Sequence, residues 1–235
     1  MAKKRKHRKR RHPQPLVPRS RPFEEIIEEA RRLAEVSRLE EALEVLESAP
    51  AHMQRRFEML LLRGTLLSEL GFSLEAIEVF EQALRAAPGH PIVLTHLTFL
   101  YDEAGWVAHT ARTVRQALEA SESLPPDVVA ELRRIAKDTM AEIHEKAAAG
   151  PAPLERVEKA LYLSEQAHRR LTLGQFEEAA RLYRQASRVV PTWIPPYNNM
   201  ALSLFFTGQV KNCLLYTSDA ADEGLGVDLG GRRII

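Results

Sequence analysis

The chain has 235 residues, of which 45% are hydrophobic and 28% charged; this composition excludes a wholly disordered chain and allows a sizeable core. We expect neither a transmembrane helix nor a secretory signal, because no long apolar run occurs and the N-terminus leads directly into lysines and arginines. The single cysteine, Cys213, excludes a disulfide framework. Together these features favour a cytoplasmic protein.

Residues 1–22 form a predicted disordered, polybasic tail. They contain ten Lys or Arg, four prolines and no acid. This charge allows salt-sensitive association with nucleic acid or the ribosome, without sequence specificity because no aromatic residues are interleaved. A merely solubilising tail explains the charge equally well, and an anionic membrane surface and a nuclear-import signal stay open as alternatives. The polyanion-binding cations are Lys3, Lys4, Arg5, Lys6, Arg8, Lys9, Arg10 and Arg11.

A repeat of small, aromatic and proline residues dominates the chain from Phe23 onward. Two segments share successive spacings of 7, 5, 4, 3 and 5 residues. The two sets are Gly64, Gly71, Ala76, Phe80, Ala83 and Pro88, and then Ala167, Gly174, Ala179, Tyr183, Ala186 and Pro191. Weaker copies begin 34 residues to either side of the first set, at Ala30 and Thr98, and a partial copy begins at Ala201. A fixed period of this length indicates a repeat architecture.

With these residues the sequence resembles the tetratricopeptide repeat family, whose unit is a helix-turn-helix of 34 residues. The resemblance implies an all-α fold in which helix pairs stack as a right-handed superhelical solenoid. The residue types suit that fold physically. Small residues at Gly64 and Ala76 allow the two helices of a unit to approach closely, while Phe80 fills space toward the next unit. Gly71 suits the turn between the helices, and Pro88 ends the second helix.

The predicted organisation has five parts. They are a tail over 1–22, three repeat-like units over 23–124, a spacer helix and linker over 125–153, one unit plus the first helix of a truncated unit over 154–212, and a terminal segment over 213–235. The first unit reads as a degenerate cap whose second helix, about Glu40 to Ser48, is short. In the third unit Thr110 replaces a small alanine, which we expect to loosen that helix pair.

The spacer lacks the repeat spacing and reads as one long helix from about Asp127 to Ala149. Asp127 follows a proline pair and is the predicted N-cap, and Gly150 followed by Pro151 is the predicted stop. We expect this helix to interrupt or bend the superhelix.

The last 23 residues, Cys213 to Ile235, have no helical period and crowd four glycines into their final twelve positions. They resemble a translated sequencing-library adaptor of the transposase type in the stretches CLLYTSDAADE and VDLGGRRII. We expect this segment to carry no function, and the native protein to continue past about Asn212 with a second helix that covers the truncated unit.

No catalytic or cofactor-binding pattern is present, and we expect a protein that is not an enzyme. Phosphate-binding glycine loops, nucleophile elbows and zinc-binding HExxH are absent from the sequence. The histidines are scattered without metal-ligand spacing. The run Glu24, Glu25, Glu28 and Glu29 is better explained as an acidic helix N-terminus than as a catalytic acid pair.

The resemblance places the ligand groove on the first helices of successive units, and so predicts a protein-protein interaction scaffold that binds an extended segment of a partner. Solvated helix surface is about as good an explanation for any single position. The alternative is a nucleic-acid- or ribosome-associated adaptor anchored by the basic tail. The expected groove residues are Glu58, Leu61, Thr65, Glu69, Thr95, Phe99, Asp102, Ser164 and His168. A chaperone-tail clamp is disfavoured because Ser164, His168 and Asn199 stand where it needs Lys or Arg.

The tail hypothesis predicts binding to a heparin column that weakens steeply with salt, because each neutralised anion releases a counterion. Deletion of residues 1–22 should abolish the retention. Retention that is unchanged after the deletion would show that the body of the protein, and not the tail, binds polyanions.

Overall fold

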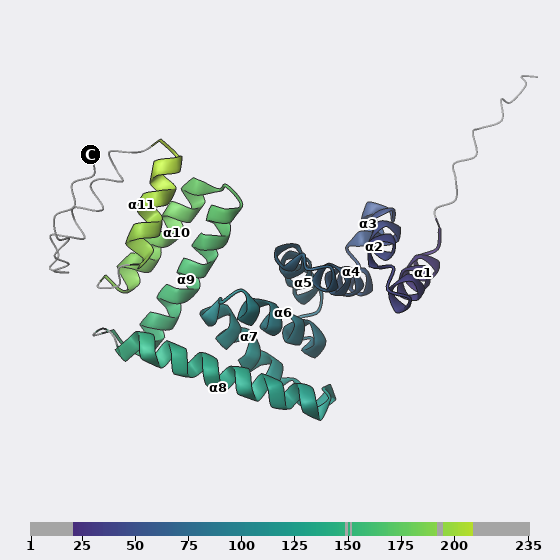
Figure 1. Cartoon of the computed structure of the whole chain (residues 1–235), viewed down its shortest axis with the longest axis horizontal. Coiled ribbons are helices and arrows are strands. Elements are labelled where there is room, and N and C mark those ends of the chain that lie inside the picture. The colour runs from purple at the N-terminus through teal and green to yellow at the C-terminus, as the bar shows by residue number, and fades with distance from the viewer. Residues whose placement is uncertain (1–20, 149, 151, 192–194, 209–235) are drawn as a thin grey trace, which may run out of the picture.

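The computed structural model describes residues 21–148, 150, 152–191 and 195–208. Within these residues all regular secondary structure is helical (Figure 1). The elements are α1 (Phe23–Glu35), α2 (Leu39–Glu47), α3 (Ala51–Gln54), α4 (Phe57–Glu69), α5 (Ser73–Ala86), α6 (Pro91–Glu103), α7 (Val107–Glu119), the 3-10 helix η1 (Ser121–Ser123), α8 (Pro126–Ala148), α9 (Leu154–Thr172), α10 (Phe176–Val189) and α11 (Pro195–Phe206). None of these helices is long and apolar enough to cross a membrane.

The helices pack as pairs joined by short turns, which confirms the predicted all-α repeat fold. The pairs are α1 with α2, α4 with α5, α6 with α7, and α9 with α10. The turn glycines adopt positive φ, as at Gly71 with φ 82°, a conformation that side chains with a Cβ rarely adopt. The second helices end just before the predicted prolines: α5 at Ala86, ahead of Pro88, and α10 at Val189, ahead of Pro191. The cap helix α2 is short, as expected.

Close contact inside the second unit depends on Gly64. A Cβ placed on this glycine would lie 2.7 Å from the ring of Phe80, which is fully buried. The same ring stacks on the His96 imidazole of the next unit, with ring centroids 4.7 Å apart. Phe80 therefore packs within its own unit and against its neighbour at once, as the spacing predicted.

The third unit accommodates Thr110 within its core. This residue is 1% exposed, and its hydroxyl donates a hydrogen bond to the Trp106 carbonyl at 2.9 Å. The added oxygen is therefore not left unpaired in the core.

The spacer is a single long helix, α8, but its start differs from the prediction. Asp127 is not the N-cap, because the helix begins one residue earlier, at Pro126. Proline suits the first helical position, where its missing N–H would have no partner. Asp127 lies in the first turn instead, where its carboxylate interacts favourably with the helix dipole. The described helix ends at Ala148.

Helix α8 takes the place of a first helix on the third unit. Its Leu132 and Ile135 are buried in one cluster with Val114 of α7 and Leu94 of α6. The repeat spacing is absent from this stretch, because α8 buries larger aliphatic side chains than the small residues of the repeat. The array continues from α7 into α8 without a gap.

Helix α9 has two packing roles along its length. Its first half buries Val157 and Leu161 against Ala108 of α7 and Ile143 of α8. Its second half carries the repeat residue Ala167 and pairs with α10. Figure 1 shows α9 leading away from the end of α8, with α10 and α11 alongside it. The direction of the array therefore changes at the linker between α8 and α9.

Helix α11 packs on α10 through Met200 and Leu204 but leaves large side chains in solvent. Phe205 is 58% and Phe206 55% exposed. The expected continuation of the native protein past about Asn212 stays a prediction. The predicted disordered tail, apart from residues 21 and 22, lies outside the described residues. The predicted adaptor-derived segment lies wholly outside them.

The fully buried Ala76 gives a test of the repeat packing. Ala76→Leu should lower the free energy of unfolding by roughly 1 to 3 kcal/mol, because the larger side chain overpacks the contact between α4 and α5. Ala86→Leu, on the exposed surface of the same helix, is the matched control and should change it by less than about 0.5 kcal/mol. Equal unfolding midpoints for the two variants in urea titrations would contradict the assigned packing.

Candidate functional site

The predicted groove residues of α4 and α6 lie at the spacing of one helical face. On α4 these are Glu58, Leu61, Thr65 and Glu69, and on α6 they are Thr95, Phe99 and Asp102. The three acidic residues are exposed, and Phe99 is 37% exposed although it is a large apolar residue. Helices α4 and α6 are in contact, so the two rows are neighbours.

Not every predicted position offers surface to a partner. Thr95 is 8% exposed, and its hydroxyl donates to the Pro91 carbonyl at 2.9 Å. Leu61 is half-buried against the core. Ile92, which was not among the predicted groove residues, is 45% exposed and lies seven residues before Phe99 on the same face. That spacing was the signal that could have found it.

Helix α8 extends this face beyond α6, which the sequence analysis did not foresee. Burial raises the pKa of the Asp102 carboxyl, while the charge of Arg134 on α8 opposes the rise and that of Glu131 adds to it. Arg134 itself pairs with Glu131 at 2.6 Å and with Asp138 at 2.8 Å. We call the exposed sides of α4, α6 and α8 the groove face.

The two predicted groove residues of α9 lie in a different place. Ser164 and His168 line a cleft of about 310 Å³ together with Gly105, Glu142 and Asn199. The Ser164 hydroxyl donates to the Ala160 carbonyl at 2.8 Å. Buried Tyr183 lies against the same cleft, and burial raises its pKa to about 12. The structure therefore does not gather Ser164 and His168 with the groove residues of α4 and α6.

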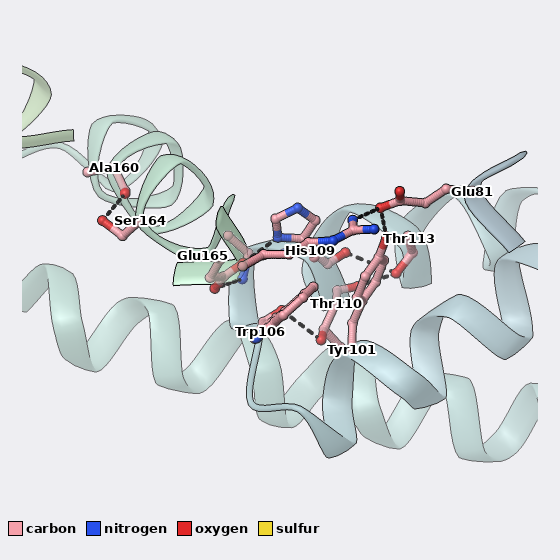
Figure 2. A network of polar contacts seen from close by, with 11 residues as sticks. Glu81, Tyr101, Trp106, His109, Thr110, Thr113, Ala160, Ser164 and Glu165 are labelled. Atoms are coloured by element: carbon pink, nitrogen blue, oxygen red, sulfur yellow. Dashed lines mark hydrogen bonds and ion pairs between the residues drawn. The ribbon is translucent and has the colours of Figure 1, made fainter. Parts of the chain in front are cut away.

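A buried carboxylate links α9 to the start of α7. Glu165 accepts hydrogen bonds from the backbone N–H of Ala108 at 2.8 Å and of His109 at 3.0 Å (Figure 2). It also binds His109 Nδ1 at 2.6 Å, and both side chains are only 10% exposed. The first N–H groups of a helix have no partner inside it, so this carboxylate serves as an N-terminal cap supplied by another helix. We call this contact the Glu165 clasp.

A second polar network joins α9 to the second unit. Arg169 binds Glu81 at 2.7 Å and Glu78 at 3.3 Å, both on α5. Burial opposes the charge on Arg169, but the hydrogen bonds and charges of these two carboxylates prevail and raise its pKa. The Tyr101 hydroxyl donates to Glu81 at 2.9 Å (Figure 2), and burial, together with the Glu81 charge, raises the pKa of Tyr101.

These two networks border a cavity of about 470 Å³ between α5, α6, α7, α9 and α10. Its walls combine arginines with aromatic rings. The Arg112 guanidinium lies over the Tyr162 ring, 4.2 Å from the centroid. We call this cavity the arginine cleft. No sequence motif pointed to it, because its residues come from five helices.

Two of the described histidines and two of the acidic residues at the start of α1 have structural roles. Burial lowers the pKa of His96, which stacks on Phe80, and His109 belongs to the clasp. Glu24 and Glu25 lie in the first turn of α1, as expected for an acidic helix N-terminus. Among the described residues no group of three or more His, Cys, Asp or Glu could hold a metal ion.

Comparison with known proteins finds a family model that matches part of the chain. The family model described as tetratricopeptide repeat matches residues 27–92. No curated protein matches the sequence. Among solved structures, the chain is similar to a crystal structure of MamA protein (10% identity, 91% of this chain and 97% of that chain covered, TM-score 0.40). It is also similar to MamA from Desulfovibrio magneticus RS-1 (15%, 88% and 97%, 0.39) and to the TPR2AB domain of yeast Sti1 in a complex with pHSP90 (17%, 86% and 77%, 0.43).

The clasp gives a prediction for stability. Glu165→Ala should lower the free energy of unfolding by about 1 to 3 kcal/mol, because two buried N–H groups of α7 lose their acceptor. Glu145→Ala, which removes an exposed carboxylate from α8, is the control and should change it by less than about 0.5 kcal/mol. Thermal unfolding followed by circular dichroism measures both. A Glu165→Ala protein as stable as the control would show that the clasp does not stabilise the fold.

Proposed function

Because residues 27–92 carry tetratricopeptide repeats, we propose that this protein is a protein-protein interaction scaffold that binds an extended segment of a partner along the groove face. The polar networks of the described chain join helices to one another and form no constellation suited to catalysis. This arrangement favours a binding function over an enzymatic one.

The observation that carries the proposal is the pair of exposed apolar side chains on α6. Ile92 and Phe99 lie on one face of that helix, 45% and 37% exposed. Full burial of a large aliphatic or aromatic side chain is worth about 1.5 to 3 kcal/mol. A partner segment that covers both residues gains part of that free energy, and central apolar contacts of this kind dominate many interfaces.

The charges beside this pair indicate the chemistry of the partner. Glu69 and Asp102 border it with exposed carboxylates, and the exposed Glu58 carboxylate on α4 lies 3.8 Å from Arg56. On α8, the positive charge of Arg134 is already neutralised by Glu131 and Asp138. The groove face is therefore acidic around an apolar centre. It suits a partner segment that combines Lys or Arg with apolar residues.

Nucleic-acid association through the basic tail stays an independent prediction. Its cations, Lys3 to Arg11, lie outside the described residues, and the groove face offers a nucleic acid mainly carboxylates. The experiment on the tail therefore tests a function separate from the groove.

A displayed library of random peptides, selected on the full chain, tests the groove. The selected peptides should be rich in Lys, Arg and apolar residues. The double variant Ile92→Ser/Phe99→Ser should bind them at least about tenfold more weakly, a loss of about 1.4 kcal/mol. Calorimetric titration of the purified peptides measures the change.

The matched control is Leu74→Ser/Leu173→Ser, which removes two apolar side chains of similar exposure, 40% and 45%, away from α6. It should keep the affinity of the parent chain. Selected peptides that bind the groove variant and the control variant equally well would contradict the proposal.

A further inference from the structure

The arginine cleft is lined by both first and second helices of the array, and α6 contributes to it as well as to the groove face. Its walls come from α5, α6 and α7 on one side and from α9 and α10 on the other. The residues that decide its chemistry are Glu81, Arg85, Arg112, Arg169, Arg170 and Glu178. Four cations therefore face two carboxylates in one cavity.

Ion pairs within the protein occupy both carboxylates. Glu81 accepts hydrogen bonds from Arg169 and from the Tyr101 hydroxyl. Glu178 lies 3.6 Å from Arg170. These contacts neutralise two of the four arginines, and they leave no lining carboxylate for the other two.

Arg85 and Arg112 are the two remaining cations. Both are exposed, and neither forms an ion pair with a carboxylate of the described residues within the cleft. Arg112 is oriented by its contact with the Tyr162 ring. A guanidinium that lies on an aromatic face keeps its N–H edges free to donate. Two guanidinium groups in the lining of one cavity thus offer hydrogen bonds to an anion from outside the chain.

The cleft is held in shape before any ligand arrives. Arg169 fixes α9 to α5, and the Glu165 clasp fixes α9 to α7 (Figure 2). A binding site whose walls are already positioned loses less entropy when its ligand binds.

We propose that the arginine cleft binds an acidic segment of a partner protein, whose carboxylate side chains accept hydrogen bonds from Arg85 and Arg112. Guanidinium and carboxylate groups match in geometry and bind through two parallel hydrogen bonds. A nucleic acid fits the cleft less well, because its backbone needs a row of cations. Here Glu81 and Glu178 lie in the same lining as the two free arginines, and Glu78 pairs with Arg169.

The test uses the full chain with Lys3, Lys4, Arg5, Lys6, Arg8, Lys9, Arg10 and Arg11 replaced by Gln, because the basic tail is itself predicted to bind polyanions. The probe is fluorescein-labelled hexaglutamate, and fluorescence anisotropy at physiological salt measures its affinity. In this background Arg85→Gln/Arg112→Gln should weaken binding at least about tenfold. Hexaglutamine should not bind.

The matched control is Arg133→Gln/Arg188→Gln, which removes two exposed arginines outside the cleft and should change the affinity by less than about twofold. Ile92→Ser/Phe99→Ser should also leave it unchanged, so failure of the cleft and failure of the groove are seen in different variants. Equal loss in the cleft and control variants, or no binding of hexaglutamate to the parent, would overturn the proposal. A hexauridylate that binds as tightly as hexaglutamate would overturn it too.

Discussion

Glu165 reaches from α9 to two backbone N–H groups at the start of α7, and the arrangement of the later helices follows from this contact. A carboxylate removed from water is costly unless hydrogen bonds and charge compensate it. Here both N–H groups, the positive end of the α7 dipole and His109 provide that compensation. The first half of α9 then buries Val157 and Leu161 beside the clasp. Helix α9 is held at one position on the array, and α10 and α11 follow from it.

This arrangement departs from a simple stack of repeats. In a solenoid each unit contacts only its neighbours, and stability is a sum of nearest-neighbour terms. Arg169 instead joins the last described helix pair to α5 of the second unit. The contact closes the arginine cleft and ties it to the unit that also carries Gly64 and Phe80. The two proposed binding surfaces thus share one framework, in which α6 contributes Phe99 to one and Tyr101 to the wall of the other.

The helix pairs could be predicted from the sequence, because they depend on residues that are close together in the chain. Gly64, Ala76 and Phe80 specify a helix pair because their sizes must match across one short turn. The place of α8 could not be predicted, because Leu132 and Ile135 form an ordinary amphipathic helix whose partners lie outside the repeat pattern. The roles of Glu165 and Arg169 were missed for a different reason. Their partners are 56 to 91 residues away, and two of the partners of Glu165 are backbone groups, which no side-chain pattern can reveal.

Two of the partners of Glu165 are backbone groups. The two sides of this contact therefore differ in how well they tolerate mutation. Every residue except proline supplies an N–H, so substitutions at positions 108 and 109 that fit the space leave two of the three hydrogen bonds available. Position 165 has no such freedom, because an acceptor of that length and charge is supplied only by glutamate. During evolution, residues of α7 around the contact are therefore free to vary, whereas the contact itself depends on a single residue of α9, Glu165.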